Sequence, residues 1–122
     1  MIQLCLNSRD EMLIVDLDQV AYIQASGNYC KLMYISGQSL LISLGLAKIE
    51  TLIRKINISS TPNRYVRLGR SLIINQRYLF RISLTRQRLV LSDYSKNLHE
   101  LEVSKPVLKQ YKEQLSKSII AK

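Results

Sequence analysis

The sequence predicts a mainly β fold with two helices. Apolar and polar residues alternate with a period of two along most of the chain, as they do in strands with one buried face. Turn-forming residues separate these segments at intervals of about 8–12 residues, which is typical of antiparallel sheets. Two other segments have helical spacing. With 122 residues, 47% hydrophobic and 22% charged, the chain fits one globular domain, residues 1–122.

Strands are expected where short β-rich segments are bounded by turns. An acidic turn at Asp10 and Glu11 and the pair Gly27-Asn28 separate early segments, and residues 93–97 separate the last two. Residues 59–63, Ser-Ser-Thr-Pro-Asn, are expected to form a loop. The expected strands are residues 2–6, 12–15, 20–25, 29–35, 39–44, 65–67, 71–75, 78–84, 88–92 and 98–103.

Helices are expected at residues 46–56 and at about residues 105–119. In the first, apolar residues recur at helical spacing and charged residues occupy the other face. In the second, Ser104 is a candidate N-cap and Pro106 suits the first turn. The apolar positions are Leu46, Ile49, Leu52, Ile53 and Ile56 in the first helix, and Val107, Leu108, Tyr111 and Leu115 in the second.

The formal net charge of +9 is confined to the second half of the chain. Residues 1–61 carry five basic and five acidic side chains, whereas residues 62–122 carry 13 basic and four acidic ones. Seven arginines and no acidic residue lie between residues 64 and 88. Such asymmetry favours a polyanionic partner, and arginine can grip phosphates and guanine edges with two hydrogen bonds. The alternative is a solvated basic face, although such faces usually mix both signs.

The sequence offers little for catalysis, metal binding or a cofactor. His99 is the single histidine and lies in a strand-like alternation, with no nucleophile at a recognisable spacing. Cys5 and Cys30 are too few for a disulfide framework, which indicates a reduced, cytoplasmic protein. No apolar run approaches the ~18 residues of a membrane-spanning helix, and the N-terminus does not resemble a signal peptide.

Binding is better supported, because several polar turns are rich in amide, hydroxyl or basic side chains. These groups, together with backbone N–H groups at loop tips, are the ones that contact phosphates and base edges. Loops on a rigid β scaffold can make such contacts without a recognition helix. The turns are residues 26–28, 69–71, 75–77 and 103–105.

In this order, the turns resemble the LytTR-type DNA-binding domain of bacterial transcription regulators. Residues 20–29, VAYIQASGNY, are similar to the family's I-x-Y-I-E-A-x-x-N-Y, and the helix 46–56 follows. Residues 65–75, YVRLGRSLIIN, are similar to F-x-R-x-H-x-S-x-x-V-N, and residues 103–105, VSK, to V-S-R. The likeness covers about residues 2–110. In three places the chain departs from the pattern, with Gln24 for glutamate, Gly69 for histidine and Lys105 for arginine.

The resemblance implies an elongated arrangement of small antiparallel sheets with one internal short helix and a C-terminal helix. It implies sequence-specific binding of double-stranded DNA, as in the output domains of two-component response regulators. Loops would enter two successive major grooves and follow the minor groove between them. Promoter direct repeats or paired half-sites, and a second copy of the chain on DNA, are the expected partners.

The resemblance also implies the residues that contact DNA. Base recognition would fall on Cys30 or its neighbours Asn28 and Lys31, on Arg70 and on Lys105. The remaining candidates are Tyr29, Arg67, Ser71, Asn75 and Arg77. Structural roles remain open for several: Asn28 and Asn75 could hold turns, Arg67 could be an ion-pair partner, Tyr29 could pack, and Cys30 could be a small strand residue.

Two other functions remain open. One is an RNA-binding β module, which would need exposed aromatics on a sheet face, and the eight aromatic residues show no such cluster in the sequence. The other is a protein-interaction module that modulates another regulator. LytTR domains usually follow a receiver domain or a membrane segment, and this chain shows neither. It is therefore expected to be a stand-alone regulator or an excised C-terminal part whose signalling partner lies elsewhere.

Overall fold

The computed structural model describes residues 3–57 and 64–118, and the loop expected at residues 59–63 lies outside these ranges. The strands are β1 (Gln3–Asn7), β2 (Met12–Asp16), β3 (Val20–Ser26), β4 (Tyr29–Tyr34), β5 (Ser39–Ile42), β6 (Tyr65–Leu68), β7 (Leu72–Asn75), β8 (Leu79–Ser83), β9 (Arg88–Ser92) and β10 (Leu98–Glu102). The α-helices are α1 (Leu46–Asn57) and α2 (Lys105–Ser118), and two short 3-10 helices are η1 (Leu17–Gln19) and η2 (Gln76–Tyr78).

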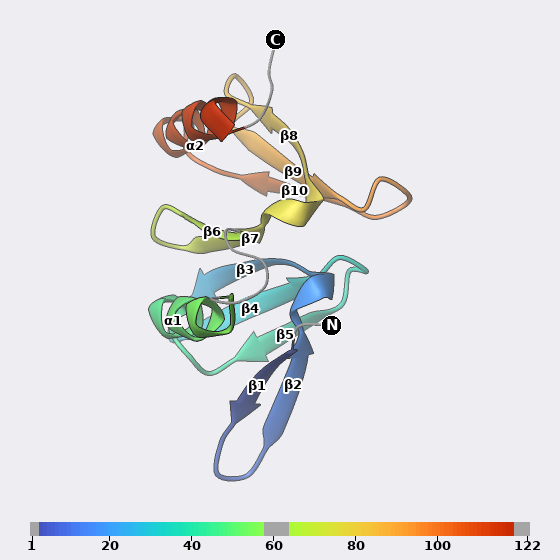
Figure 1. The fold of residues 1–122 in the computed structure, drawn as a ribbon, viewed down its shortest axis with the longest axis vertical. Coiled ribbons are helices and arrows are strands. Elements are labelled where there is room, and N and C mark those ends of the chain that lie inside the picture. Colours follow the sequence, from blue (N-terminus) through green and yellow to red (C-terminus); the bar gives the residue numbers. More distant parts are fainter. Residues whose placement is uncertain (1–2, 58–63, 119–122) are drawn as a thin grey trace.

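The strands form three antiparallel sheets that follow one another along the long axis of the molecule (Figure 1). The β1–β2 hairpin forms one end. A five-stranded sheet in the order β5-β4-β3-β7-β6 occupies the middle, and a three-stranded sheet in the order β10-β9-β8 lies at the other end with α2. The expected mainly β, elongated arrangement with one internal and one C-terminal helix is therefore confirmed.

The centre of the middle sheet, formed by β7 and the first four residues of β3, is buried on both faces. Successive side chains of a strand point to opposite sides, so these two strands contribute to two cores. Tyr22 of β3 pairs with Ile74 of β7, and both belong to the core shared with α2 and the three-stranded sheet. The next pair, Ile23 and Ile73, belongs to the core shared with α1 and the hairpin. This double burial explains why β3 and β7 contain runs of consecutive apolar residues.

The two α-helices each cover one of these cores. Ile49 and Ile53 of α1 are buried against the side of the sheet that also receives Leu4 and Val15 of the hairpin. Leu108 and Tyr111 of α2 are buried in the other core. The helical spacing in the sequence predicted both ends of α1 and the start of α2 to within one residue. The expected end of the second helix, at about residue 119, lies outside the described residues.

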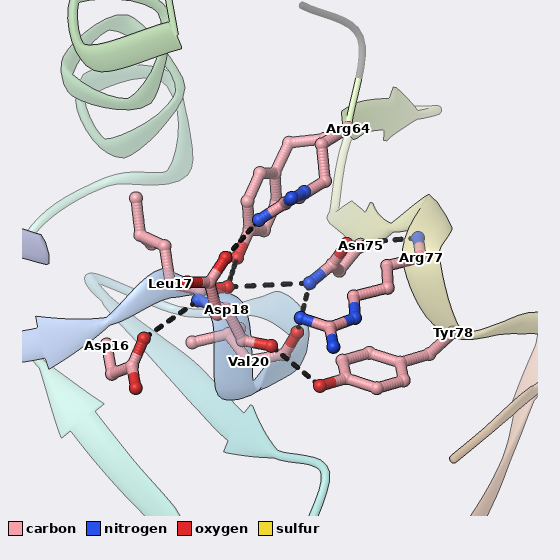
Figure 2. Close-up of polar contacts among 9 residues, drawn as sticks. Asp16, Leu17, Asp18, Val20, Arg64, Asn75, Arg77 and Tyr78 are labelled. Atoms are coloured by element: carbon pink, nitrogen blue, oxygen red, sulfur yellow. Dashed lines mark hydrogen bonds and ion pairs between the residues drawn. The ribbon is translucent and has the colours of Figure 1, made fainter. Parts of the chain in front are cut away.

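The short helix η1 is fixed by contacts from residues far along the chain (Figure 2). The amide of Asn75 is fully buried; its Nδ2 donates to the carbonyl of Val20 at 2.9 Å and to that of Leu17 at 3.4 Å. Its Oδ1 accepts the N–H of Arg77 at 3.1 Å and so caps η2. One side chain therefore joins the start of β3 to the end of β7.

Three further side chains connect η1 to residues after α1. Tyr78 donates its hydroxyl to the carbonyl of Asp18 at 2.6 Å, and Arg64 forms an ion pair with the Asp18 carboxylate. The hydroxyl of Tyr65 donates to the carbonyl of Leu17. Burial raises the pKa of the Tyr65 phenol well above its ordinary value, so this hydroxyl remains a donor at neutral pH.

The two short helices were not predicted: η1 lies between two expected strands, and η2 overlaps the polar turn expected at residues 75–77. Each has only three residues and no hydrophobic period to detect. Their positions are set by side chains instead: Asp16 accepts the N–H of Asp18 at 3.0 Å in η1, as Asn75 does for η2.

Replacing Asn75 with alanine should destabilise the protein strongly. The change would leave the buried carbonyls of Leu17 and Val20 and the N–H of Arg77 without this partner, which we expect to lower the free energy of unfolding by about 2–3 kcal/mol. Chemical denaturation followed by circular dichroism measures this. The exposed Asn28→Ala is the matched control and should change stability by less than about 0.5 kcal/mol. Equal stabilities of the two variants would contradict the assignment.

Candidate nucleic-acid interface

Two of the polar turns noted in the sequence lie side by side. The β3–β4 turn and the β6–β7 turn are at the same end of the middle sheet because β3 and β7 are antiparallel. The N–H of Ala25 donates to the carbonyl of Ser71 at 2.8 Å, which ties the two turns together. Asn28 and Arg70 are exposed at their tips.

The beginning of α2 lies against the second of these turns. Gly69 in the β6–β7 turn has a φ of 67°, a conformation that favours glycine. A Cβ atom at Gly69 would lie 3.7 Å from Cγ2 of Val107, so the turn packs directly on the first turn of α2. Lys105, the first residue of α2, is exposed beside this contact.

The β8–β9 turn lies beside the turn at residues 103–105, which leads into α2, and is the fourth turn of this group. The N–H of Val103, just before α2, donates to the carbonyl of Gln87 at 3.1 Å. Arg86 in this turn is exposed. Arg86 is one of the seven arginines between residues 64 and 88, but the sequence gives no reason to place it in the site, since only the pairing of β9 with β10 brings it near Lys105.

These four turns form one surface, called the turn surface below. Its exposed or half-buried members are Asn28, Tyr29, Lys31, Arg70, Ser71, Arg86 and Lys105. No acidic residue occurs in the turns themselves, residues 26–31, 69–71, 84–87 and 103–105. The surface therefore presents positive charge, amide and hydroxyl groups, and the exposed Glu102 beside it lies 3.9 Å from Arg88.

Arg67 lies behind the turn surface and holds it. Its Nη1 forms an ion pair with Oε1 of Glu50 in α1 at 2.9 Å, and its Nη2 donates to the carbonyl of Arg70 at 2.8 Å. Glu50 also binds Arg54 at 3.0 Å. Arg67 thus links α1 to the backbone of the β6–β7 turn, so it has the structural ion-pair role left open by the sequence.

Two candidate residues of the sequence analysis have buried side chains. Cys30 is fully buried in the core beneath α1, and burial raises the pKa of its thiol while Arg67 lowers it. The buried amide of Asn75 is engaged by backbone groups, as described above. Of the residues around Cys30, Asn28 and Tyr29 are exposed, Tyr29 with 50% of its surface accessible, and Lys31 is half-buried.

Arg77 is exposed but lies away from the turn surface. The β6–β7 turn precedes β7, whereas Arg77 follows β7 in η2, so Arg70 and Arg77 are at opposite ends of that strand. The Arg77 guanidinium stacks over the ring of Tyr78, 5.6 Å from its centroid. The structure therefore brings together every polar turn noted in the sequence except residues 75–77.

The lone histidine has a packing environment. Nε2 of His99 lies 3.0 Å from the carbonyl oxygen of Ile35, and the ring meets that of Tyr22 edge-on at 6.1 Å between centroids. Within residues 3–57 and 64–118, no three His, Cys, Asp or Glu side chains gather as a metal site. In the same ranges, neither α-helix is long and apolar enough to cross a membrane.

The geometry thus defines a β-rich domain that presents a basic row of turns, a class of protein suited to polyanions. The chain belongs to the LytTR family: the family model described as the LytTr DNA-binding domain matches residues 10–116. This is a family of DNA-binding domains and not of enzymes.

A solved structure supports the same fold. It is the LytTr DNA-binding domain of a response regulator from Bacillus cereus, with 18% sequence identity and a TM-score of 0.64. The match covers 94% of this chain and 97% of the other. No sequence among the curated proteins matches.

Removing the Arg67 guanidinium should loosen the β6–β7 turn without unfolding the domain. In Arg67→Ala, loss of the bond to Arg70 should weaken the turn by about 1 kcal/mol. Hydrogen exchange of the Ala25 amide, which donates to Ser71, should then become roughly fivefold faster. Arg54→Ala removes the other cation bound to Glu50 and is the matched control. Equal acceleration in both variants would show that Arg67 does not hold the turn.

Proposed function

We propose that this chain is a sequence-specific, double-stranded DNA-binding domain that acts in bacterial transcription regulation as the output part of a response regulator. The observation that carries the proposal is the turn surface: four turns from separate parts of the chain present basic and amide groups at one side of a rigid scaffold. Membership in the LytTR family supports DNA as the polyanion.

On this proposal the turns recognise DNA without a recognition helix. Arg70, at the tip of the central turn, can donate two parallel hydrogen bonds to the O6 and N7 atoms of guanine. Asn28 and Lys105, from the turns on either side, would contact base edges, and Tyr29, Lys31, Ser71 and Arg86 would contact sugars and phosphates. Because the turns form a row, they can enter two successive major grooves and follow the minor groove between them.

Residues behind the surface would set its geometry. Arg67 holds the Arg70 backbone through the bond described above, and Asn75 holds the far end of the same hairpin. Cys30 fills the core beneath the β3–β4 turn. These three residues of the predicted site would therefore affect DNA binding through position and not through direct contact.

The departures from the family pattern shape the expected specificity. Gly69 has no side chain to donate a hydrogen bond, but its φ of 67° is a turn conformation that favours glycine. Lysine at position 105 keeps a positive charge but cannot form the bidentate pair of an arginine. Base discrimination should therefore depend mostly on Arg70 and Asn28.

The proposal includes the setting in which the domain works. Binding by one copy to one short element should be weak, and promoter direct repeats or paired half-sites would strengthen it through a second copy. A receiver domain or another signalling partner outside this chain would control occupancy in a two-component system. DNA as the ligand places the domain in the cytoplasm of a bacterial cell.

The experiment that tests the function is selection from random duplex DNA at two salt concentrations. Enrichment of paired short elements, bound with strong salt dependence, is the expected result. Salt-sensitive binding with no enriched element would mean that the basic side chains contact phosphates without recognising a sequence. Tighter binding of single-stranded RNA than of any duplex would instead favour an RNA-binding module.

The salt dependence itself can be predicted. If about six phosphates are neutralised, log K should fall with log salt at a slope near −5. Fluorescence anisotropy with a labelled duplex over a series of salt concentrations measures this slope. A slope near zero would rule out phosphate contacts as the main source of affinity.

Arg70→Ala should lose affinity for the selected duplex and relax its sequence preference. The expected loss is about 1–3 kcal/mol, because a bidentate contact to guanine would be removed. Arg77→Ala removes the same side chain at the opposite end of β7 and serves as the comparison. A larger loss for Arg77→Ala than for Arg70→Ala would place the interface away from the turn surface.

A further inference from the structure

The three-stranded sheet has a core face and an outer face, because successive side chains of a strand point to opposite sides. Leu89, Leu91 and Leu101 point into the core shared with α2 and the middle sheet. The residues that alternate with them define the outer face, and all but Ser92 are exposed or half-buried. They are Phe80, Arg81 and Ser83 of β8, Arg88, Val90 and Ser92 of β9, and Leu98, Glu100 and Glu102 of β10.

A bulge in β8 puts Phe80 and Arg81 on the outer face together. The register of β8 against β9 shifts between Leu79 and Arg81, so Phe80 and Arg81 both lie opposite Val90. Simple alternation along the sequence would have assigned these two neighbours to opposite faces. Val90 itself is half-buried and belongs to neither core.

Large apolar side chains lie on both sides of β9 at the end of the outer face nearest the β9–β10 turn. On the β8 side, Phe80 is 53% exposed and Tyr94 of the turn is 69% exposed. Their rings meet edge-on with centroids 5.5 Å apart, and the Tyr94 hydroxyl donates to the carbonyl of Leu79 at 2.9 Å. On the β10 side, Leu98 is 58% exposed. Exposed apolar side chains gathered in this way are typical of protein contact surfaces.

The charges of the outer face are separated across β9. Arg81 of β8 and Glu100 of β10 flank Val90 at the same level of the sheet. Arg88 of β9 is directed towards β10, with Nε 3.5 Å from Oε1 of Glu100 and Nη1 3.9 Å from Oε2 of Glu102. One guanidinium beside two carboxylates leaves one net negative charge on the β10 side, whereas Arg81 gives one positive charge on the β8 side. The β9–β10 turn adds one charge of each sign, Asp93 and Lys96.

This pattern is complementary to itself. If two sheets pack outer face to outer face about a two-fold axis parallel to β9, β8 of each copy lies over β10 of the other. Arg81 of one copy then meets Glu100 of the second, Phe80 meets Leu98, and each contact occurs twice, as in any isologous interface. An axis at right angles to β9 would instead place β10 over β10 and oppose their carboxylates, so the charges select the first arrangement.

We propose that two copies of this chain pair through the outer faces of their three-stranded sheets, about a two-fold axis parallel to β9. Sheets that pack face to face lie about 10 Å apart, a gap that long side chains such as Arg81 and Glu100 can span from opposite sides. The outer face shares no residue with the turn surface, so the pairing goes beyond the proposed function and does not require DNA.

Sedimentation equilibrium of the full chain in the absence of nucleic acid tests the pairing. The unmodified protein should shift from the mass of one chain to twice that mass as its concentration rises. It should show no larger species, because a two-fold interface closes on itself. The mass of one chain at every concentration up to about 1 mM, where even a weak pair would be detected, would overturn the proposal.

Charge-reversal variants test the orientation. Arg81→Glu and Glu100→Lys should each weaken self-association at least about tenfold, because each brings like charges together at two places. An equimolar mixture of the two variants should pair again, since both contacts of the mixed pair then join opposite charges. Arg9→Glu, the same change at an exposed arginine in the β1–β2 turn, is the matched control and should pair as the unmodified protein does.

The apolar part of the contact has its own variant. Phe80→Ser should weaken self-association at least about tenfold, because its ring would no longer pack on Leu98 of the second copy. Leu41→Ser changes a residue of β5 that is 71% exposed and lies outside the outer face, and it should leave the pairing unchanged. Circular dichroism of every variant shows whether its fold is intact.

The mixture experiment is decisive because misfolding cannot imitate its expected result. Pairing in the mixture, together with monomers in each charge-reversal variant alone, supports the proposed interface. Pairing that survives Arg81→Glu and Phe80→Ser would overturn it and place the contact on another surface. A mixture in which both folded variants remain monomeric would also overturn it. None of these results bears on whether the domain binds DNA, so the proposed function stands or falls separately.

Discussion

The buried amide of Asn75 is the constraint on which the rest of this fold depends. It holds the carbonyls of Leu17 and Val20 and caps η2, so it fixes where β3 begins relative to where β7 ends. A buried backbone group without a partner is costly, and one side chain here satisfies three. Because η2 leads directly into the three-stranded sheet, the same amide also orients that sheet on the middle one. These hydrogen bonds of Asn75 therefore help to fix how the three-stranded sheet follows the middle sheet along the molecule.

The double-sided burial of the middle sheet determines where function can lie. With α1 and the hairpin on one face and α2 with the three-stranded sheet on the other, the first four residues of β3 and all of β7 are buried. The turns at the strand ends are the parts that remain accessible. Polar and basic residues gather there, while apolar residues are exposed mainly at the outer sheets. The fold thus separates a side with basic and polar turns from the outer sheets, where apolar side chains are exposed.

The position of the β6–β7 turn within the turn surface is set by residues that lie behind it. Arg67 connects Glu50 of α1 to the backbone at Arg70, and Val107 of α2 packs on Gly69 of the same turn. Both α-helices therefore act on the turn that offers Arg70 to a ligand. If the proposed function holds, a signalling partner that shifted either helix would move this arginine without touching it.

The sequence by itself determined the local elements: the spacing of Leu46, Ile49 and Ile53 specifies α1, and Gly69 specifies a turn before β7. It also determined the basic character of the second half. Tertiary structure decided which side chains are available. Asn75 and Cys30 are polar or reactive in type, yet contacts from residues distant in sequence enclose them. Arg86 joins Lys105, and Phe80 joins Tyr94, only through strand pairing. The type of a residue sets which bonds its side chain can form, but packing against residues distant in sequence decides whether that side chain is exposed to solvent or buried.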